Sequence, residues 1–202
     1  SAGNDTMKLL LSSTSGVDIS AVTMTDVDNV GLDTDADGTM TIAQHNVINS
    51  GAGTNKVTLT GNGTVTGNSA IEEYALASGA NNFTLANVSQ TVTGNSGVDE
   101  IVGGSGDDTI SGLGGDDILS GGLGADRIIG GADEDTLTGG GGADTFVFAT
   151  GASGSTESTK DTIQDYNAAE DTLEFDVTHS DAKAYTEVNA GADGLRMFGD
   201  EF

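Results

Sequence analysis

A nine-residue repeat between Gly94 and Val147 constrains the fold more than any other feature of this chain. Cut at every ninth residue, the segment reads GNSGVDEIV, GGSGDDTIS, GLGGDDILS, GGLGADRII, GGADEDTLT and GGGGADTFV. The first position is always glycine, the sixth is always aspartate and the eighth is always apolar. Such regular self-similarity indicates one structural unit that is stacked on copies of itself.

Each repeat divides into a turn and a strand. Positions one to six are rich in glycine, which permits positive φ angles and close approach of the backbone. Positions seven to nine predict a short strand with one inward apolar side chain at position eight. A lone hairpin cannot bury one apolar residue in nine, but stacked strands about 4.8 Å apart can. Two repeats make a coil of 18 residues, so the sequence predicts an all-β fold with three coils of a parallel β-roll solenoid.

In that stack the sixth-position aspartates of alternate repeats lie above one another. Like charges about 5 Å apart repel by roughly 1 kcal/mol in water, and by several at a lower effective dielectric. A bound cation reverses the sign of this energy. Carboxylate and carbonyl oxygens in flexible loops suit Ca²⁺ better than Mg²⁺. A solvated acidic face would not explain why aspartate keeps a nine-residue register with glycine.

The repeats resemble the repeats-in-toxin (RTX) family, whose GGxGxDxUx nonapeptide binds calcium in a parallel β-roll. The resemblance covers about 54 residues and implies four complete Ca²⁺ sites between the loops of alternate repeats. The implied ligands are the carboxylates of Asp99, Asp108, Asp117, Asp126, Asp135 and Asp144 and the turn carbonyls of Gly104, Gly106, Gly122 and Gly124. Asn95 and Leu113 replace the second glycine of the motif, and Asp133 replaces the fourth. The site at Asp133 is therefore either distorted or supplied with an extra ligand.

The region before the repeats reads as solenoid with a weaker pattern. Turns of Gly, Asn and Ser separate short runs at Val57–Thr60, Thr64–Thr66, Asn82–Leu85 and Thr91–Thr93. No aspartate ladder accompanies them, so we expect calcium-free coils held by apolar stacking and by Asn or Thr ladders. Residues 71–77 (IEEYALA) fit either a short helix or a bulged strand.

Residues 17–48 alternate Val, Ile and Met with Thr and Asp and read as further strands, as at residues 19–27. Within them Asp33–Gly38 begins like an EF-hand loop. The twelfth position is Gln44 instead of a bidentate glutamate, and no amphipathic helix precedes the segment. This favours a polar turn over a separate weak calcium site.

After the repeats, Asp161–Tyr166 and Glu170–Leu173 are similar to the stretch that closes the β-roll in many secreted RTX proteins. Such a cap would cover an open edge strand. Asp161 and Asp165 either take part in calcium binding near the cap or are surface charge. The predicted organisation is a calcium-poor solenoid over 1–93, a calcium-binding roll over 94–148 and a C-terminal capping region over 149–202.

Composition excludes several classes of function. The chain has 32 acidic and 6 basic residues, so no basic stripe can neutralise the phosphates of a nucleic acid. It has no cysteine for disulfides or thiolate metal sites. No run approaches the roughly 18 apolar residues of a membrane helix. A signal peptide is absent, and a start at Ser1 is expected of a piece of a longer protein.

No catalytic motif is present either. His45 and His179 lie far apart and outside any H-E-x-x-H, and the chain has no G-x-S-x-G. We therefore predict a protein that is not an enzyme. The RTX resemblance implies a bacterial protein that leaves the cell unfolded through type I secretion machinery and folds outside, where calcium is plentiful.

These inferences favour a calcium-dependent structural module of a secreted, surface-layer-like or adhesin-like cell-surface protein. Self-association and cell-surface polysaccharide are the further partners considered. The alternative is a non-catalytic secretion and folding domain of an extracellular protease, lipase or polysaccharide-modifying enzyme. A carbohydrate-binding or ice-binding face is disfavoured because the Thr runs are irregular.

Overall fold

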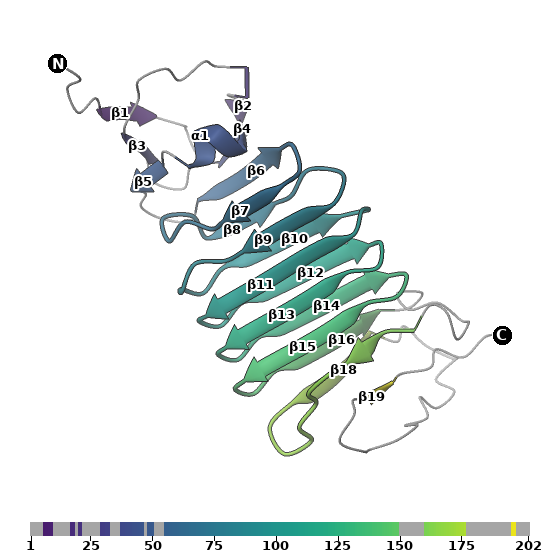
Figure 1. Cartoon of the computed structure of the whole chain (residues 1–202). Helices are drawn as coiled ribbons and strands as arrows, with labels where there is room; N and C mark the ends of the chain where they lie inside the picture. Colours follow the sequence, from purple (N-terminus) through teal and green to yellow (C-terminus); the bar gives the residue numbers. More distant parts are fainter. Residues whose placement is uncertain are drawn as a thin grey trace.

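The computed structural model describes residues 6–9, 17–18, 20–21, 29–32, 37–46, 48–50, 55–149, 160–176 and 195–196. These residues form a β-solenoid whose strands stack side by side along one axis (Figure 1). All strand pairs in the described residues are parallel except that of β17 with β19. The predicted all-β parallel solenoid is therefore confirmed.

Two long sheets form the walls of the solenoid. The nine-stranded sheet contains, in spatial order, β18 (Thr172–Asp176), β16 (Thr145–Ala149), β14 (Arg127–Ala132), β12 (Thr109–Gly114), β10 (Thr91–Asn95), β8 (Glu73–Ala75), β6 (Lys56–Thr60), β4 (Asp37–Thr41) and β2 (Val17–Asp18). The seven-stranded sheet contains β19 (Leu195–Arg196), β17 (Thr162–Ile163), β15 (Thr136–Gly141), β13 (Ile118–Leu123), β11 (Asp99–Ser105), β9 (Asn81–Thr84) and β7 (Thr64–Thr66). A third sheet contains β1 (Thr6–Leu9), β3 (Asn29–Leu32) and β5 (Ile48–Ser50).

Consecutive strands of the repeats alternate between the two long sheets, so each coil takes two repeats. Ile110 pairs with Ile128 in one sheet, and Leu119 pairs with Leu137 in the other. The strands are longer than predicted: β12 has six residues and runs into the first three positions of the next repeat. Small residues at these positions keep the backbone pairing, as between Gly104 and Gly122.

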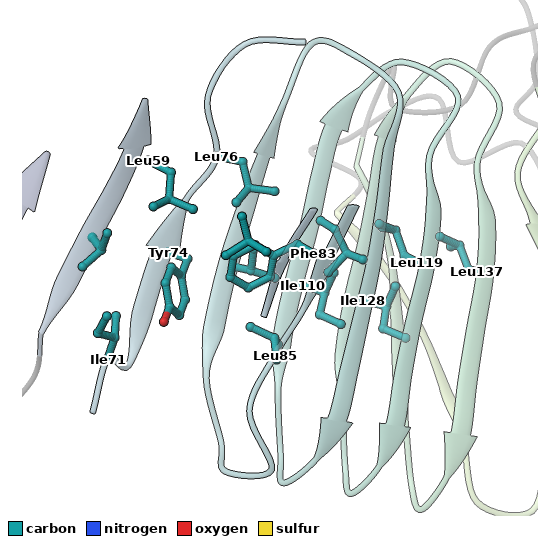
Figure 2. Packing of buried hydrophobic residues seen from close by; sticks show 14 of the residues in the cluster. Leu59, Ile71, Tyr74, Leu76, Phe83, Leu85, Ile110, Leu119, Ile128 and Leu137 are labelled. Atoms are coloured by element: carbon teal, nitrogen blue, oxygen red, sulfur yellow. The ribbon is translucent and has the colours of Figure 1, made fainter. Parts of the chain in front are cut away.

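The core is a single file of eighth-position side chains between the sheets. All of them are fully buried: Ile101, Ile110, Leu119, Ile128, Leu137 and Phe146. Figure 2 labels four of them, Ile110, Leu119, Ile128 and Leu137. It also labels the larger neighbours Tyr74 and Phe83, whose ring centroids lie 4.8 Å apart. The core and both sheets extend without a break from the repeats into the region before residue 93, because β10 pairs with β8 as well as with β12.

Elements before the repeats agree with most of the expectations. The four predicted runs coincide with β6, β7, β9 and β10. Residues 71–77 contain a strand, β8, and not a helix, because Tyr74 points into the core. Of the strands expected over 17–48, the structure contains β2 to β5, and residues 22–28 lie outside the described part.

A short helix, α1 (Ile42–His45), was not expected. Its N-cap is Thr41, and the Gln44 side-chain oxygen accepts a hydrogen bond from the Thr41 N–H at 2.8 Å. The first four residues of the EF-hand-like segment lie outside the described residues, and Asp37 begins β4. Its twelfth residue, Gln44, therefore serves as a capping residue.

Candidate metal centre

The sixth-position aspartates form two ladders that run along the inside of the solenoid. We call them the aspartate ladders: one contains Asp99, Asp117 and Asp135, and the other contains Asp108, Asp126 and Asp144. Each Oδ1 accepts the backbone N–H of the residue one coil earlier. All six side chains are at most 1% exposed. The predicted stacking of these residues is thus present, with the carboxylates turned inward.

Four carboxylate oxygens in the ladders lack a partner. Among the described residues, the buried side-chain oxygens without a hydrogen bond are Oδ2 of Asp108, Asp117, Asp126 and Asp135. Burial of a charged oxygen without compensation costs several kcal/mol. These carboxylates therefore require either a proton or a cation.

The first-position glycines provide the space that these oxygens occupy. A Cβ atom on Gly103 would lie 2.0 Å from the carbonyl oxygen of Gly121 and 2.7 Å from Oδ2 of Asp108. A Cβ atom on Gly112 would lie 2.0 Å from Oδ2 of Asp117. A carboxylate oxygen and a carbonyl oxygen thus converge where a side chain would otherwise be. This oxygen donor set suits a hard cation such as Ca²⁺.

The predicted carbonyl donors lie where successive turns touch. A Cβ atom on Gly122 would be 2.3 Å from the oxygen of Gly104, and one on Gly124 would be 2.2 Å from the oxygen of Gly106. The carbonyl oxygens of Gly122 and Gly124 approach the glycines one coil later in the same way. The turns can therefore stack only because these positions lack a side chain.

Burial is the main electrostatic cost of the ladders. Desolvation raises the pKa of Asp108 and of Asp117 to about 7, and that of Asp135 to about 8. Neighbouring carboxylates raise these pKa values further, as Asp126 does for Asp108. Desolvation is therefore a larger cause than the mutual repulsion that the stacking of aspartates predicts.

Two departures from the motif keep the turn conformation. Leu113 and Asp133 have φ angles of 78° and 81°, and they are the only described residues other than glycine with positive φ. Asp133 is exposed, and its Oδ2 accepts the N–H of Gly115 at 3.3 Å. Its carboxylate is solvent-exposed, and its charge contributes to the raised pKa of Asp117 in the buried ladder.

The C-terminal segment extends both ladders. Asp161 is buried, and its Oδ1 accepts the N–H of Asp135 at 3.1 Å. Asp171 Oδ1 accepts the N–H of Asp144 at 3.0 Å. Strands β17 and β18 follow these residues and add one further strand to each sheet. The predicted cap is thus a continuation of the solenoid.

Asp165 has a different place from Asp161. It is exposed, and its two carboxylate oxygens accept the N–H groups of Gly139 and Gly140 at 2.9 and 2.8 Å. Sequence reasoning missed Asp171, because it lies 27 residues after Asp144 instead of 18. The dipeptide Asp-Thr stands where each of the strands β15, β16, β17 and β18 begins, and this pattern could have identified Asp171.

Sequence reasoning also missed the ladder residues before the repeats. The N–H of Asn81 donates to Asp99 at 3.0 Å, and that of Gln90 donates to Asp108 at 2.8 Å. Both lie 18 residues before their acceptors, so extending the register backwards would have found them.

A family comparison decides the class of this segment. The family model of the RTX calcium-binding nonapeptide repeat, in four copies, matches residues 93–128 and 120–153. The chain carries RTX repeats. These repeats bind calcium, so Ca²⁺ is the ion of this region. No curated protein and no solved structure matches the chain.

The ladders fit the ion that the RTX repeats bind. Their unpartnered oxygens are the hard donors that Ca²⁺ prefers. Within the described ranges no group of three or more His, Cys, Asp or Glu residues is placed so that these side chains alone could hold a metal ion. An RTX β-roll is a structural calcium-binding module, which agrees with the expectation of a non-enzyme.

The remaining site candidates are structural in the described part of the chain. His45 is buried, and its Nε2 lies 3.0 Å from Oη of Tyr74. His179 is outside the described residues. A search of the described helices finds none with the length and apolar character needed to cross a membrane.

Proposed function

We propose that this chain is a calcium-dependent structural module of a secreted bacterial cell-surface protein. The observation that carries the proposal is the set of four buried carboxylate oxygens without partners. At neutral pH these charges oppose folding of the repeats, and bound calcium removes the opposition. Binding and folding then become one event. RTX repeats are typical of type I-secreted proteins, which fold outside the cell, where calcium is plentiful.

In this proposal each ion lies between successive turns of one ladder. The turn carbonyls bring neutral oxygens, and the ladder aspartates bring charge. Asp126 lies in the middle of its ladder and serves two ions, one on each side. The proposed ligands are the carboxylates of Asp108, Asp117, Asp126, Asp135 and Asp144 with the carbonyls of Gly104, Gly106, Gly122 and Gly124.

The calcium requirement is tested by circular dichroism on metal-free protein. Strand content should rise when calcium is added and fall again with a chelator. Magnesium at the same concentration is the control and should restore less strand, because it demands a stricter octahedral geometry. A spectrum that is indifferent to calcium would contradict the proposal.

The cell-surface role is tested by electron microscopy and light scattering of the calcium-loaded protein. Ordered sheets or oligomers are expected if the module builds a surface structure. A monomer at every calcium concentration would overturn that role. It would support the alternative, in which the roll is the secretion and folding domain of an extracellular enzyme.

A further inference from the structure

At the first repeat a side-chain amide bonds the carboxylate of the ladder aspartate. Nδ2 of Asn95 donates to Oδ2 of Asp99 at 2.9 Å and to Oδ1 at 3.2 Å. The backbone N–H of Asn95 also donates to Oδ2, at 3.1 Å. The Asp99 carboxylate is therefore fully satisfied, in contrast to the four ladder carboxylates with unpartnered Oδ2 atoms.

The same amide also binds the preceding coil. Nδ2 of Asn95 donates to the carbonyl oxygen of Gly79 at 3.0 Å. Nδ2 of Asn81 donates to the same carbonyl oxygen at 2.9 Å and to Oδ1 of Asp99 at 2.8 Å. Two NH₂ groups thus join a carboxylate to a turn carbonyl across neighbouring coils. In the later repeats the proposed calcium ions make this connection.

Gln90 holds the register position of Asn81 on the other ladder, but its side-chain amide bonds backbone groups and leaves Oδ2 of Asp108 without a partner. Oε1 of Gln90 accepts the N–H of Ala86 at 2.6 Å. Its Nε2 donates to the carbonyl oxygens of Asn68, at 3.0 Å, and of Ile71, both in the preceding coil. Gln90 is only 3% exposed, so this amide is a built part of the interior.

We propose that the side-chain amides of Asn81, Gln90 and Asn95, here called the amide cap, replace calcium at the N-terminal end of both ladders. The Asp99 carboxylate then holds no ion, because the amides of Asn81 and Asn95 already occupy both of its oxygens and join it to the preceding coil. The coils up to Asp99 need no calcium to fold. They form a preformed end of the solenoid, on which the following repeats fold one after another as they bind calcium. This inference rests on the proposed calcium binding by the later repeats.

Calcium stoichiometry, measured by isothermal titration calorimetry, tests whether the Asp99 carboxylate holds an ion. Asn95→Gly restores the glycine of the motif and removes the side-chain amide from Oδ2 of Asp99, so it should add about one calcium ion per chain. Asn82→Gly is the matched control, because Asn82 is exposed and its side chain donates to the exposed Glu100, outside the ladder. It should leave the stoichiometry unchanged. Asp99→Ala should also leave it unchanged.

The inference is overturned if Asp99→Ala removes an ion from a protein that otherwise binds calcium, or if Asn95→Gly adds none. A wild-type protein that binds no calcium would instead overturn the proposed function, so the two failures are distinct.

Hydrogen exchange on the wild-type chain tests the preformed end without a variant. In chelator, amides of β6 to β10 should stay protected while those of β12 to β16 lose protection. Loss of protection in all of these strands together would contradict the preformed end.

Discussion

Oδ1 of Asp126 accepts a hydrogen bond from the backbone N–H of Asp108, one coil earlier, at 2.8 Å. The N–H of Asp126 in turn donates to Oδ1 of Asp144 at 2.9 Å. One oxygen of each ladder aspartate therefore orders the backbone, while Oδ2 of Asp126 has no partner. This division separates the structural role of an aspartate from its role toward the ion.

The middle position of Asp126 predicts unequal effects of aspartate substitutions. Asp126→Ala should lower calcium affinity by about tenfold or more, which is about 1.4 kcal/mol, and should impair two sites. Asp99→Ala should have little effect, because Asn95 already satisfies that carboxylate. Isothermal titration calorimetry measures both changes. Asp126→Asn separates the two roles, since it keeps an Oδ1 acceptor but removes the charge. Equal losses from Asp126→Ala and Asp99→Ala would contradict the proposed arrangement.

The sequence was sufficient to predict the parts of the fold that repeat. Strict periodicity at positions one, six and eight predicts the coil length, the apolar core and the stacking of the aspartates. The periodicity could not predict how far the carboxylates are buried, because the same register would also fit aspartates whose side chains face the solvent. The inward direction depends on the space that glycines such as Gly103 leave at each turn.

The ends of the ladders were harder to predict, because the residue type changes there. Asn81 and Gln90 keep the ladder register with neutral amides, so a search for aspartate stops at Asp99. Asp171 keeps the residue type but changes the spacing. Helix α1 begins with a reciprocal capping box between Thr41 and Gln44, which a search for strand periodicity does not detect.

The left-handed turn at Leu113 predicts a stabilising substitution. A β-carbon is strained at a φ of 78°, so Leu113→Gly should raise the free energy of unfolding by about 1 kcal/mol in saturating calcium. Leu113 is 51% exposed, so little packing is lost. Leu123→Gly is the matched control: Leu123 is 64% exposed but has no positive φ, and its substitution should destabilise. Urea denaturation measures both, and a destabilised Leu113→Gly would be inconsistent with strain at this turn.

The single-file core predicts a large loss at one isoleucine and a small one at another. Ile128→Ala removes a fully buried side chain and should cost about 2–5 kcal/mol in saturating calcium. Ile118→Ala is the control, because Ile118 is 53% exposed on the outer face and should change stability by about 0.5 kcal/mol or less. Denaturant melts at fixed calcium compare the two. Similar losses at both positions would mean that the eighth-position residues do not form the core.

The raised pKa values of the ladder predict that acid partly replaces calcium. In the metal-free roll the pKa of Asp108 and of Asp117 is about 7 and that of Asp135 about 8, whereas an unfolded aspartate titrates near 3.9. The folded state therefore binds more protons than the unfolded state across this range. The stabilising contribution is fully present below about pH 4 and is lost as the pH rises through about 7 to 8. Circular dichroism of metal-free protein should show more strand near pH 6 than at pH 8.5.

Calcium affinity should have the opposite pH dependence to the folding of the metal-free protein. Calcium must displace the protons of these carboxylates, so its affinity should rise between about pH 6 and pH 8. Burial lowers the pKa of His45, so its protonation opposes folding as the pH falls below about 6.5 and works against the expected gain of strand at pH 6. Asp107→Asn is the control, because Asp107 is exposed outside the ladder and should not abolish the response. If metal-free protein loses strand content as the pH falls from 8.5 to 6, the buried carboxylates do not limit folding of the repeats.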